Sequence, residues 1–430
     1  MKVLWLSITS DLFRNNGKTS GYNGGGWIAS LQKQLLENAK DIELGIVYPS
    51  SSKEKVVRFD TTTYFPICKP TKSLFQKILY YYLGGEKNRQ NQFTSNILNI
   101  IRDFRPDVIH LFGVENQFAT ILGKTDVPVI VHLQGLLAPY DNAFWPVGFN
   151  KGSFMWPPSI REWIFRNGFV FAKNNIHERG LREISLFKNV QYCMGRTEWD
   201  FQISQLLSPN SQYFKVNEAL RPEFYANSGK WKREKREKLI VVSTISETVY
   251  KGLDLILKTA KILKEETAIS YEWRIIGISR QSNIVKFFEH CLSIKSESVG
   301  ISYLGVKSSQ EIVANMMDCS VYVHPSYIDN SPNSVCEAQL LGVPVVACDV
   351  GGVSTILDFG NAGILVPANA PYELAYHLKQ FALEGNYCEA KRLAGLKLAM
   401  DRHNPQNIVS DLVTVYKSVI NGRLGSFNSK

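Results

Sequence analysis

Two carboxylates, Asp329 and Glu337, stand eight positions apart in the stretch DNSPNSVCEAQLLGVPVVACDVGG, residues 329–352. The stretch continues through an apolar segment into the paired glycines Gly351 and Gly352. Ionised carboxylates accept hydrogen bonds from the hydroxyl groups of a ligand, and glycines let a backbone approach another group closely. These residue types and their order indicate a ligand site at the ends of two neighbouring strands.

Glu337 also has an interpretation that needs no ligand. Ser334 and Glu337 form the S-x-x-E pattern of a capping box, in which the glutamate bonds only the start of its own helix. Against this, the polar loop HPSYIDNSPN precedes the helix and places Asp329 at the end of an apolar strand. On these residues alone both interpretations stay open.

Three glycines and one lysine are the other candidates for anion binding. Gly24, Gly25 and Gly26 precede a helix that should begin near Trp27, where backbone N–H groups can face a bulky anion. They lie well beyond the preceding strand, so they are not a GxGxxG fingerprint, and a plain flexible loop is the alternative.

Lys251 and Gly252 directly precede a second amphipathic segment. A lysine at a helix N-terminus opposes the helix dipole unless an anion is also present. Lys251 is therefore a phosphate candidate, and a solvated surface lysine is the alternative.

The elements that must position these residues alternate between short apolar runs and longer amphipathic segments, which is typical of a parallel sheet covered by helices. The predicted strands are 3–8, 43–48, 107–112, 127–133, 190–195, 239–244, 272–277, 301–305, 320–325, 343–348 and 362–367. The fold class is α/β, with two Rossmann-like domains facing each other across a cleft.

At 430 residues the chain exceeds the size at which single cores stop growing, so two domains are expected. The strand pattern restarts after the charged stretch GKWKREKREK, which has no apolar face and is interpreted as a linker. The predicted parts are a first Rossmann-like domain at 1–228, the linker at 229–238, a second Rossmann-like domain at 239–403, and a closing helix and tail at 404–430 that pack back toward the first domain.

Charge is unevenly distributed along the chain. Residues 1–238 hold 32 Lys and Arg against 21 Asp and Glu, whereas residues 239–430 hold 17 against 18. A basic first half indicates an anionic partner, for which nucleic acid, acidic lipid and a phosphorylated substrate are candidates, and a soluble domain that happens to be basic is the alternative.

Seven scattered cysteines without metal-ligand spacing indicate neither a disulfide framework nor a metal site. This cysteine usage predicts a reducing, cytoplasmic compartment. The absence of a signal peptide and of a long apolar run predicts a protein that is soluble or lies on a surface.

Several segments, in chain order, resemble the family 4 retaining glycosyltransferases of the two-domain GT-B fold, also described as glycosyl transferases group 1. The segments are YNGGGWIASL, PDVIHLFG, HLQGL, GRTEWDF, VYKGLDLILKTA, HPSYIDNSPNSVCEAQLLGVPVVACDVGGVSTIL and GILVP. The resemblance implies transfer of a sugar from a nucleotide-diphosphate sugar, such as a UDP- or GDP-sugar, with no metal and no cofactor. The resemblance also implies that the domain at 1–228 binds the acceptor and the domain at 239–403 binds the nucleotide sugar. The expected acceptor is a glycan or a polyprenyl-diphosphate-linked glycan in bacterial surface polysaccharide synthesis.

The resemblance also implies roles for individual residues. Glu337 binds the ribose hydroxyls, Asp329 lies beside the transferred sugar, and Lys251 contacts the diphosphate. Its other implied site residues are, on the donor side, Gly24, Gly25, Gly26, Asn330 and Ser334 and, on the acceptor or sugar side, Gln134 and Arg196.

Three positions depart from the family pattern. Asp329 replaces a glutamate and is shorter by one methylene, Ser246 stands where an arginine is common, and Gln134 stands where a histidine is usual. His132, two residues earlier, is predicted to be a packed strand residue.

Two other functions remain as alternatives. A nucleotide-sugar epimerase shares the fold but needs no acceptor, and a nucleic-acid-binding protein could have the same basic half, although no base-stacking module accompanies it.

Two segments of the basic half indicate a membrane partner. The first, KSLFQKILYYYLGGEKNR at 72–89, places apolar residues along one face with lysines nearby, as at the interface of an anionic membrane. The second, at 144–171, concentrates aromatic residues where acceptor-side loops are expected, and a packed core is its alternative. We expect peripheral association with the inner face of the cytoplasmic membrane.

Overall fold

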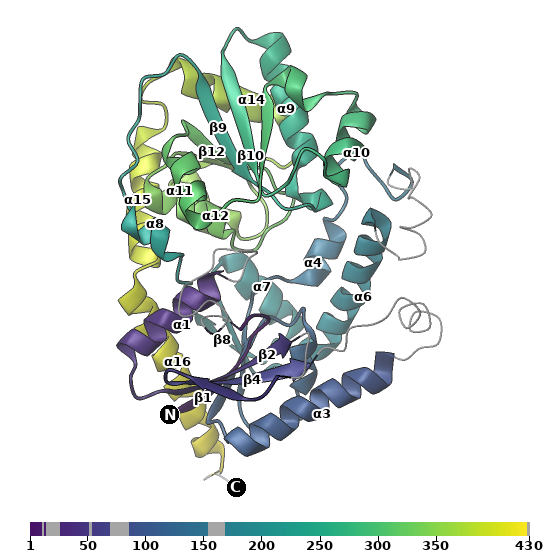
Figure 1. Ribbon diagram of the computed structural model, residues 1–430, viewed down its shortest axis with the longest axis vertical. Helices are drawn as coiled ribbons and strands as arrows, with labels where there is room; N and C mark the ends of the chain where they lie inside the picture. Colours follow the sequence, from purple (N-terminus) through teal and green to yellow (C-terminus); the bar gives the residue numbers. More distant parts are fainter. Residues whose placement is uncertain (11–12, 14–25, 51–53, 69–85, 154–167, 428–430) are drawn as a thin grey trace.

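The computed structural model describes residues 1–10, 13, 26–50, 54–68, 86–153 and 168–427. Two parallel sheets, each covered by helices, lie one above the other in Figure 1. The α/β prediction with two Rossmann-like sheets is therefore confirmed.

The first sheet has the strand order β3-β4-β2-β1-β5-β6-β7-β8, and it is parallel except where β3 pairs with β4. Its strands are β1 (Lys2–Leu6), β2 (Glu43–Ser50), β3 (Val57–Phe59), β4 (Thr62–Cys68), β5 (Val108–Phe112), β6 (Val129–His132), β7 (Tyr192–Gly195) and β8 (Gln212–Lys215). The direction of strand addition reverses between β1 and β5.

The second sheet has the order β11-β10-β9-β12-β13-β14 and is parallel throughout. Its strands are β9 (Leu239–Thr244), β10 (Tyr271–Ile276), β11 (Ile301–Gly305), β12 (Val321–His324), β13 (Val345–Cys348) and β14 (Ile364–Val366). This order reverses between β9 and β12, and open α/β sheets bind ligands beyond the carboxyl ends of strands at such a switch point.

The helices of the first half are α1 (Gly26–Asn38), α3 (Glu86–Phe104), α4 (Leu137–Asn142), α6 (Phe169–Phe187), α7 (Glu198–Leu207) and α8 (Pro222–Ala226). Those of the second half are α9 (Leu253–Glu266), α10 (Asn283–Leu292), α11 (Ser309–Met317), α12 (Asn333–Leu341), α13 (Val353–Ile356), α14 (Pro371–Leu383), α15 (Glu389–Arg402) and α16 (Pro405–Phe427). Short 3-10 turns are η1 (Gln117–Ile121), η3 (Val249–Lys251), η4 (Ser296–Val299) and η5 (Asp358–Gly360).

Three strands escaped the sequence pattern, namely β3, β4 and β8. Strand β4 contains Pro66 and two threonines, so it lacks the continuous apolar run that marks the other inner strands. Strand β8 lies at the edge of the sheet and has no buried residue, which removes the periodicity that would reveal it.

Residues 216–238 connect β8 to β9, and we call them the crossing segment. Its charged part is not wholly exposed, because Trp231 is 5% exposed and packs into the core of the second sheet. The Trp231 indole donates to the carbonyl of Cys319 at 2.9 Å. Trp231 thus anchors residues 229–238, whose other residues are mostly charged, to the second sheet.

Helix α16 packs against α1 and the first sheet (Figure 1). Its Tyr416 hydroxyl accepts a hydrogen bond from the Trp5 indole at 3.1 Å and lies 2.6 Å from Nδ1 of His110. His110 in turn lies 3.0 Å from Nδ1 of His132, which is fully buried as predicted. Burial lowers the pKa of His110 to about 3, so this chain of hydrogen bonds is neutral.

We expect Tyr416→Phe to lower the free energy of unfolding by about 1–3 kcal/mol, because the buried Trp5 N–H and His110 nitrogen each lose a partner. Urea denaturation measures the change. Tyr372→Phe is the control, because that side chain on α14 is 73% exposed and its loss should cost less than about 0.5 kcal/mol. Equal stability of the two variants would contradict the prediction.

Candidate functional site

The loops that follow β9 and β12 meet at the switch point of the second sheet. The first carries Lys251 and the second carries Asp329, and their Nζ and Oδ2 atoms are 2.5 Å apart. Gly252 makes the approach possible: it has φ 77°, and a Cβ there would lie 2.0 Å from the carbonyl oxygen of Pro325. Lys251 is thus paired and only 21% exposed at its side chain, so the alternative of a solvated surface lysine is wrong.

Asp329 is buried among polar partners. Its Oδ2 also lies 3.2 Å from Nε2 of His324, and its Oδ1 accepts from the Tyr140 hydroxyl at 3.4 Å. Burial by itself would raise the pKa of Asp329, but the Lys251 ammonium and His324 hold it well below its usual range. In the same way Asp329 raises the pKa of Lys251 against the effect of burial. Both groups are therefore charged at neutral pH.

The paired glycines lie directly against this acid. A Cβ at Gly351 would come within 1.9 Å of the carbonyl oxygen of Asp329, and one at Gly352 within 2.0 Å of that of Asn330. The Gly352 N–H donates to the Asp329 carbonyl at 3.0 Å. Close backbone contact requires glycine here, so the structure brings together the acid and the two glycines that the sequence singled out.

Residues of the first half reach this loop directly. The Tyr140 hydroxyl on α4 accepts a hydrogen bond from the Asn330 N–H at 3.1 Å, and its ring makes a T-shaped contact with Tyr250, with 5.3 Å between the ring centroids. The Asn330 amide donates to the carbonyl of Gln134 at 3.2 Å, and its oxygen accepts from Thr197 at 3.4 Å. The carboxyl ends of the two sheets are therefore joined at Asn330.

Glu337 has a partner that the sequence did not reveal. Its two oxygens each accept a hydrogen bond of 2.7 Å from Arg221, through Nε and Nη2 of the guanidinium. Helix α12 begins at Asn333 with Pro332 as its N-cap and has no side-chain cap. The capping-box interpretation of Ser334 and Glu337 is therefore wrong, because Ser334 lies inside the helix rather than at its N-cap.

Glu337 is 3% exposed. Burial raises its pKa, and the Arg221 guanidinium opposes that rise. Ser334 instead forms a side-chain hydrogen bond with Tyr322, whose hydroxyl lies 2.6 Å from that of Thr244.

A second charged pair links the crossing segment to the first sheet. Arg196, at the end of β7, pairs with the buried Glu218 and donates to the carbonyl of Leu133 at 3.1 Å. Glu218 also accepts from the Ser331 hydroxyl at 3.1 Å, just before α12. Arg196 thus ties Glu218 of the crossing segment to the first sheet, and Glu218 in turn bonds Ser331 of the second half.

The other residues singled out from the sequence are the glycines at 24–26, Gln134 and Ser246. Gly24 and Gly25 lie outside the described residues, and Gly26 is the buried first residue of α1. Gln134 is partly buried, and its side chain donates to the carbonyl of His132 at 3.3 Å. Ser246 lies at the surface, 3.0 Å from the hydroxyl of Thr248.

Sequence reasoning missed Tyr140, Arg221, Glu218 and His324. His324 is the next-to-last residue of the predicted strand 320–325 and the last residue of β12, and this position at a strand end was a usable signal. The other three come from elements distant in the sequence, and only the packing of those elements reveals them.

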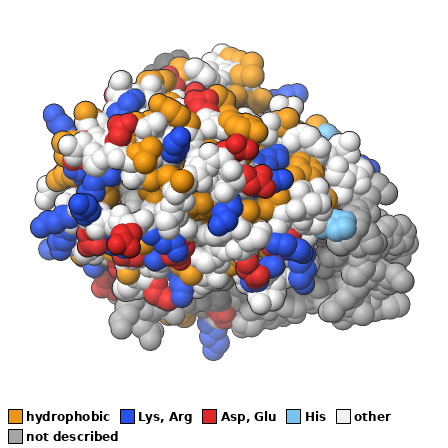
Figure 2. Space-filling view, turned by 90° about the horizontal axis from the view of Figure 1, so that it is seen from above, with side chains coloured by type: hydrophobic (Ala, Val, Ile, Leu, Met, Phe, Trp, Pro, Cys, Tyr) orange, Lys and Arg blue, Asp and Glu red, His pale blue; other side chains and the backbone are white. Residues whose placement is uncertain are grey.

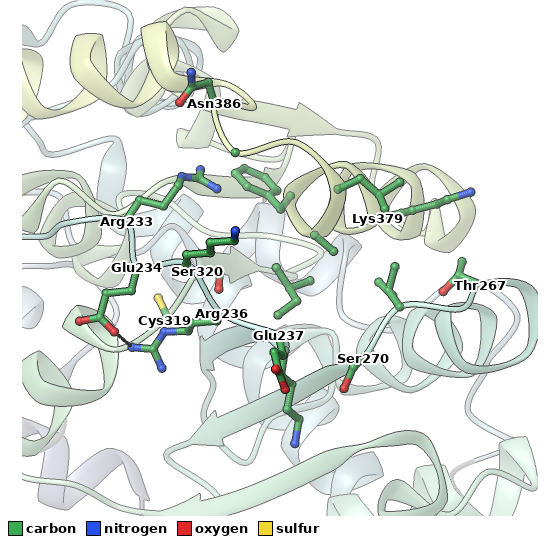
Figure 3. A pocket seen from close by; sticks show the side chains of 18 of the residues that line it. Arg233, Glu234, Arg236, Glu237, Thr267, Ser270, Cys319, Ser320, Lys379 and Asn386 are labelled. Atoms are coloured by element: carbon green, nitrogen blue, oxygen red, sulfur yellow. Dashed lines mark hydrogen bonds and ion pairs between the residues drawn. The ribbon is translucent and has the colours of Figure 1, made fainter.

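A cavity of about 1010 Å³ opens at the other edge of the second sheet (Figure 3). It is lined by the charged part of the crossing segment and by the ends of α9, α11 and α14. Helix carboxyl ends carry partial negative charge and attract cations, which accounts for the lysines and arginines there. Arg236 is further engaged by Asp318 at 2.6 Å and by Glu234. We therefore place the candidate site at the carboxyl edge, not in this cavity.

The face seen from above in Figure 2 mixes Lys and Arg side chains with acidic and hydrophobic ones over the described residues. The predicted membrane segment 72–89 lies mostly outside the described residues. In the aromatic segment, Phe149 and Phe169 pack on Phe287 of α10, at ring distances of 6.1 and 5.7 Å. No helix in the described ranges is long and apolar enough to cross a bilayer.

Comparisons with known proteins identify relatives of part of the chain. Residues 236–383 match the family model of glycosyl transferases group 1. A putative colanic acid biosynthesis glycosyltransferase of Salmonella typhimurium is 27% identical over 150 residues, which are 34% of this chain and 36% of that protein. The match therefore spans about a third of this relative's length.

Solved structures resemble the whole chain. Sucrose-phosphate synthase from Thermosynechococcus elongatus has a TM-score of 0.71 at 12% identity, covering 98% of this chain and 100% of the other. Anabaena HepE, solved with UDP and glucose, has a TM-score of 0.61 at 13% identity, covering 97% and 100%. The whole chain has the GT-B fold, and its residues 236–383 match the model of the glycosyl transferases group 1 family.

Proposed function

We propose that the protein is a retaining glycosyltransferase that moves a sugar from a nucleotide-diphosphate sugar to a glycan or lipid-linked acceptor. The observation that carries the proposal is the charged site at the switch point of the family-matched sheet, where Lys251 and Asp329 meet. Surface polysaccharide synthesis is the proposed setting, since the Salmonella relative is named for colanic acid biosynthesis.

The chemistry places its main demand on the leaving group. Breaking the bond between a sugar and a diphosphate leaves negative charge on the diphosphate, which preorganised donors stabilise. Lys251 supplies a fixed positive charge, and the N-terminus of α9 follows it directly. We propose that these groups and the glycine loop at 24–26 bind the diphosphate without a metal.

The two acids have separate proposed roles. Asp329 stays ionised and lies beside Lys251, where it would face the transferred sugar and the positive charge that develops on it. Glu337 would accept the ribose hydroxyls, because a carboxylate has about four acceptor positions and Arg221 occupies two. Gln134 and Tyr140 come from the opposite sheet, on the proposed acceptor side.

A thermal-shift screen of nucleotide sugars is the first test, and product analysis without an acceptor separates a transferase from an epimerase. Stabilisation by none of the UDP- and GDP-sugars would remove the proposed donor class.

We expect Lys251→Ala to slow release of the nucleoside diphosphate more than it weakens donor binding, because leaving-group charge grows toward the transition state. Single-turnover rates and calorimetric affinities measure the two effects. Lys258→Ala is a matched control. Lys258 lies on α9, the helix that follows Lys251, and pairs there with the buried Asp254 at 2.9 Å. Equal losses of rate and affinity in Lys251→Ala would show that the lysine only anchors the substrate.

We expect Glu337→Gln to weaken binding of UDP or GDP about tenfold or more, because charge-assisted bonds to the ribose hydroxyls are lost. The affinity for the 2′,3′-dideoxy nucleotide should stay unchanged. Isothermal titration calorimetry measures both. A variant that binds the ribonucleotide normally would refute the ribose role.

The membrane part of the proposal rests on the composition of residues 72–89. We expect the protein to sediment with anionic vesicles at low salt and not with neutral ones. Absence of binding, together with full activity on a water-soluble acceptor, would remove the membrane from the proposal and leave the transferase assignment intact.

A further inference from the structure

We propose that Arg221 is a positioning residue, which orients the Glu337 carboxylate so that its free lone pairs face the ribose diol of a nucleoside diphosphate. This inference rests on the proposed function, because it assigns a residue to the nucleotide site of that function.

The geometry of the pair is the first support. Nε and Nη2 of Arg221 each bond a different oxygen of Glu337 at 2.7 Å. A planar fork of this kind sets the plane of the carboxylate as well as its position. The Glu337 carboxylate thus has one fixed orientation, and its two remaining acceptor directions point away from the guanidinium.

The surroundings of Arg221 hold the guanidinium itself in place. Nη1 donates to the Ser309 hydroxyl at the start of α11 at 3.2 Å, and the guanidinium lies 4.7 Å from the ring centroid of Phe224. Helix α8, which Arg221 caps, packs against both α11 and α12. The position of the Glu337 carboxylate therefore depends, through Arg221, on the position of the crossing segment.

Electrostatics gives a second reason for the pairing. Glu337 is 3% exposed, and burial raises the pKa of its carboxyl. A protonated acid would offer a donor where two ribose hydroxyls need acceptors. Arg221 opposes the rise in the pKa and so keeps the acceptor form available.

A purely structural ion pair is the competing explanation, since breaking any buried pair is destabilising. The two explanations differ in what happens when the ribose hydroxyls are removed from the ligand. A positioning residue matters only for ligands that have those hydroxyls, whereas a structural residue affects all ligands of the site equally.

The experiment titrates the full-length protein with UDP, GDP and their 2′,3′-dideoxy analogues by calorimetry. We expect Arg221→Lys to weaken the preferred ribonucleotide about tenfold and its dideoxy analogue less than about twofold. Combining Arg221→Lys with Glu337→Gln should add no further loss, because both changes remove the same contact. Arg221→Gln is a second variant. A variant that unfolds cooperatively is folded, and the affinities of either folded variant decide between the positioning role and the structural role.

Arg236→Lys is the matched control. Arg236 lies on the same crossing segment and pairs with Asp318 at 2.6 Å, at the edge of the sheet away from the site. Its substitution should leave both affinities unchanged.

The possible failures are distinct. Equal loss for ribonucleotide and dideoxy nucleotide in the Arg221 variants, or no loss, overturns the inference alone when wild type and Glu337→Gln behave as expected. Wild-type protein that binds neither nucleotide, or that ignores the ribose hydroxyls, overturns the proposed donor site and the inference with it.

Discussion

A carboxylate removed from water is unstable as an anion unless a cation or several donors face it. Asp329 is buried where the two sheets meet, and the ammonium of Lys251, 2.5 Å away, meets that requirement. Neither side chain could stay buried and charged alone. The ion pair between Lys251 and Asp329 therefore holds the loops after β9 and β12 together. The position of the candidate site follows from this pair.

Backbone contact makes the pairing possible. The loops can approach only because Gly252 and Gly351 have positive φ and no side chain that would strike Pro325 or Asp329. Gly352 then ties the loop after β13 to Asp329 through its N–H. Three strand ends thus converge on one acid. A polar cluster of this density at a switch point, supported by glycines, is typical of a ligand site rather than of a packed core.

The crossing segment has an electrostatic role beyond connecting two sheets. Glu218 forms an ion pair with Arg196 at the end of β7 in the first sheet, and Arg221 forms an ion pair with Glu337 of α12. Glu218 also accepts from Ser331, so the start of α12 is held by charges from outside its own sheet. Because these pairs are buried, a relative movement of the two halves would disturb the groups on which nucleotide binding is proposed to depend.

The sequence by itself determined the α/β class, most strand positions and the gathering of Asp329 and the paired glycines at one edge, whereas Lys251 was assigned to the same site only through the family resemblance. Period and spacing are local properties, and the loops of neighbouring parallel strands must meet at one edge. It could not reveal β4 or β8, where a proline and an exposed sheet edge remove the apolar pattern.

The partners of the two acids were decided only by the tertiary structure. Tyr140 reaches Asp329 across 189 positions, and Arg221 reaches Glu337 across 116. The S-x-x-E pattern suggested a local bond for Glu337, but α12 begins two residues too early for Ser334 to cap it. A buried charge takes whichever partner the packing brings to it, and that partner is set by how distant elements pack rather than by sequence spacing.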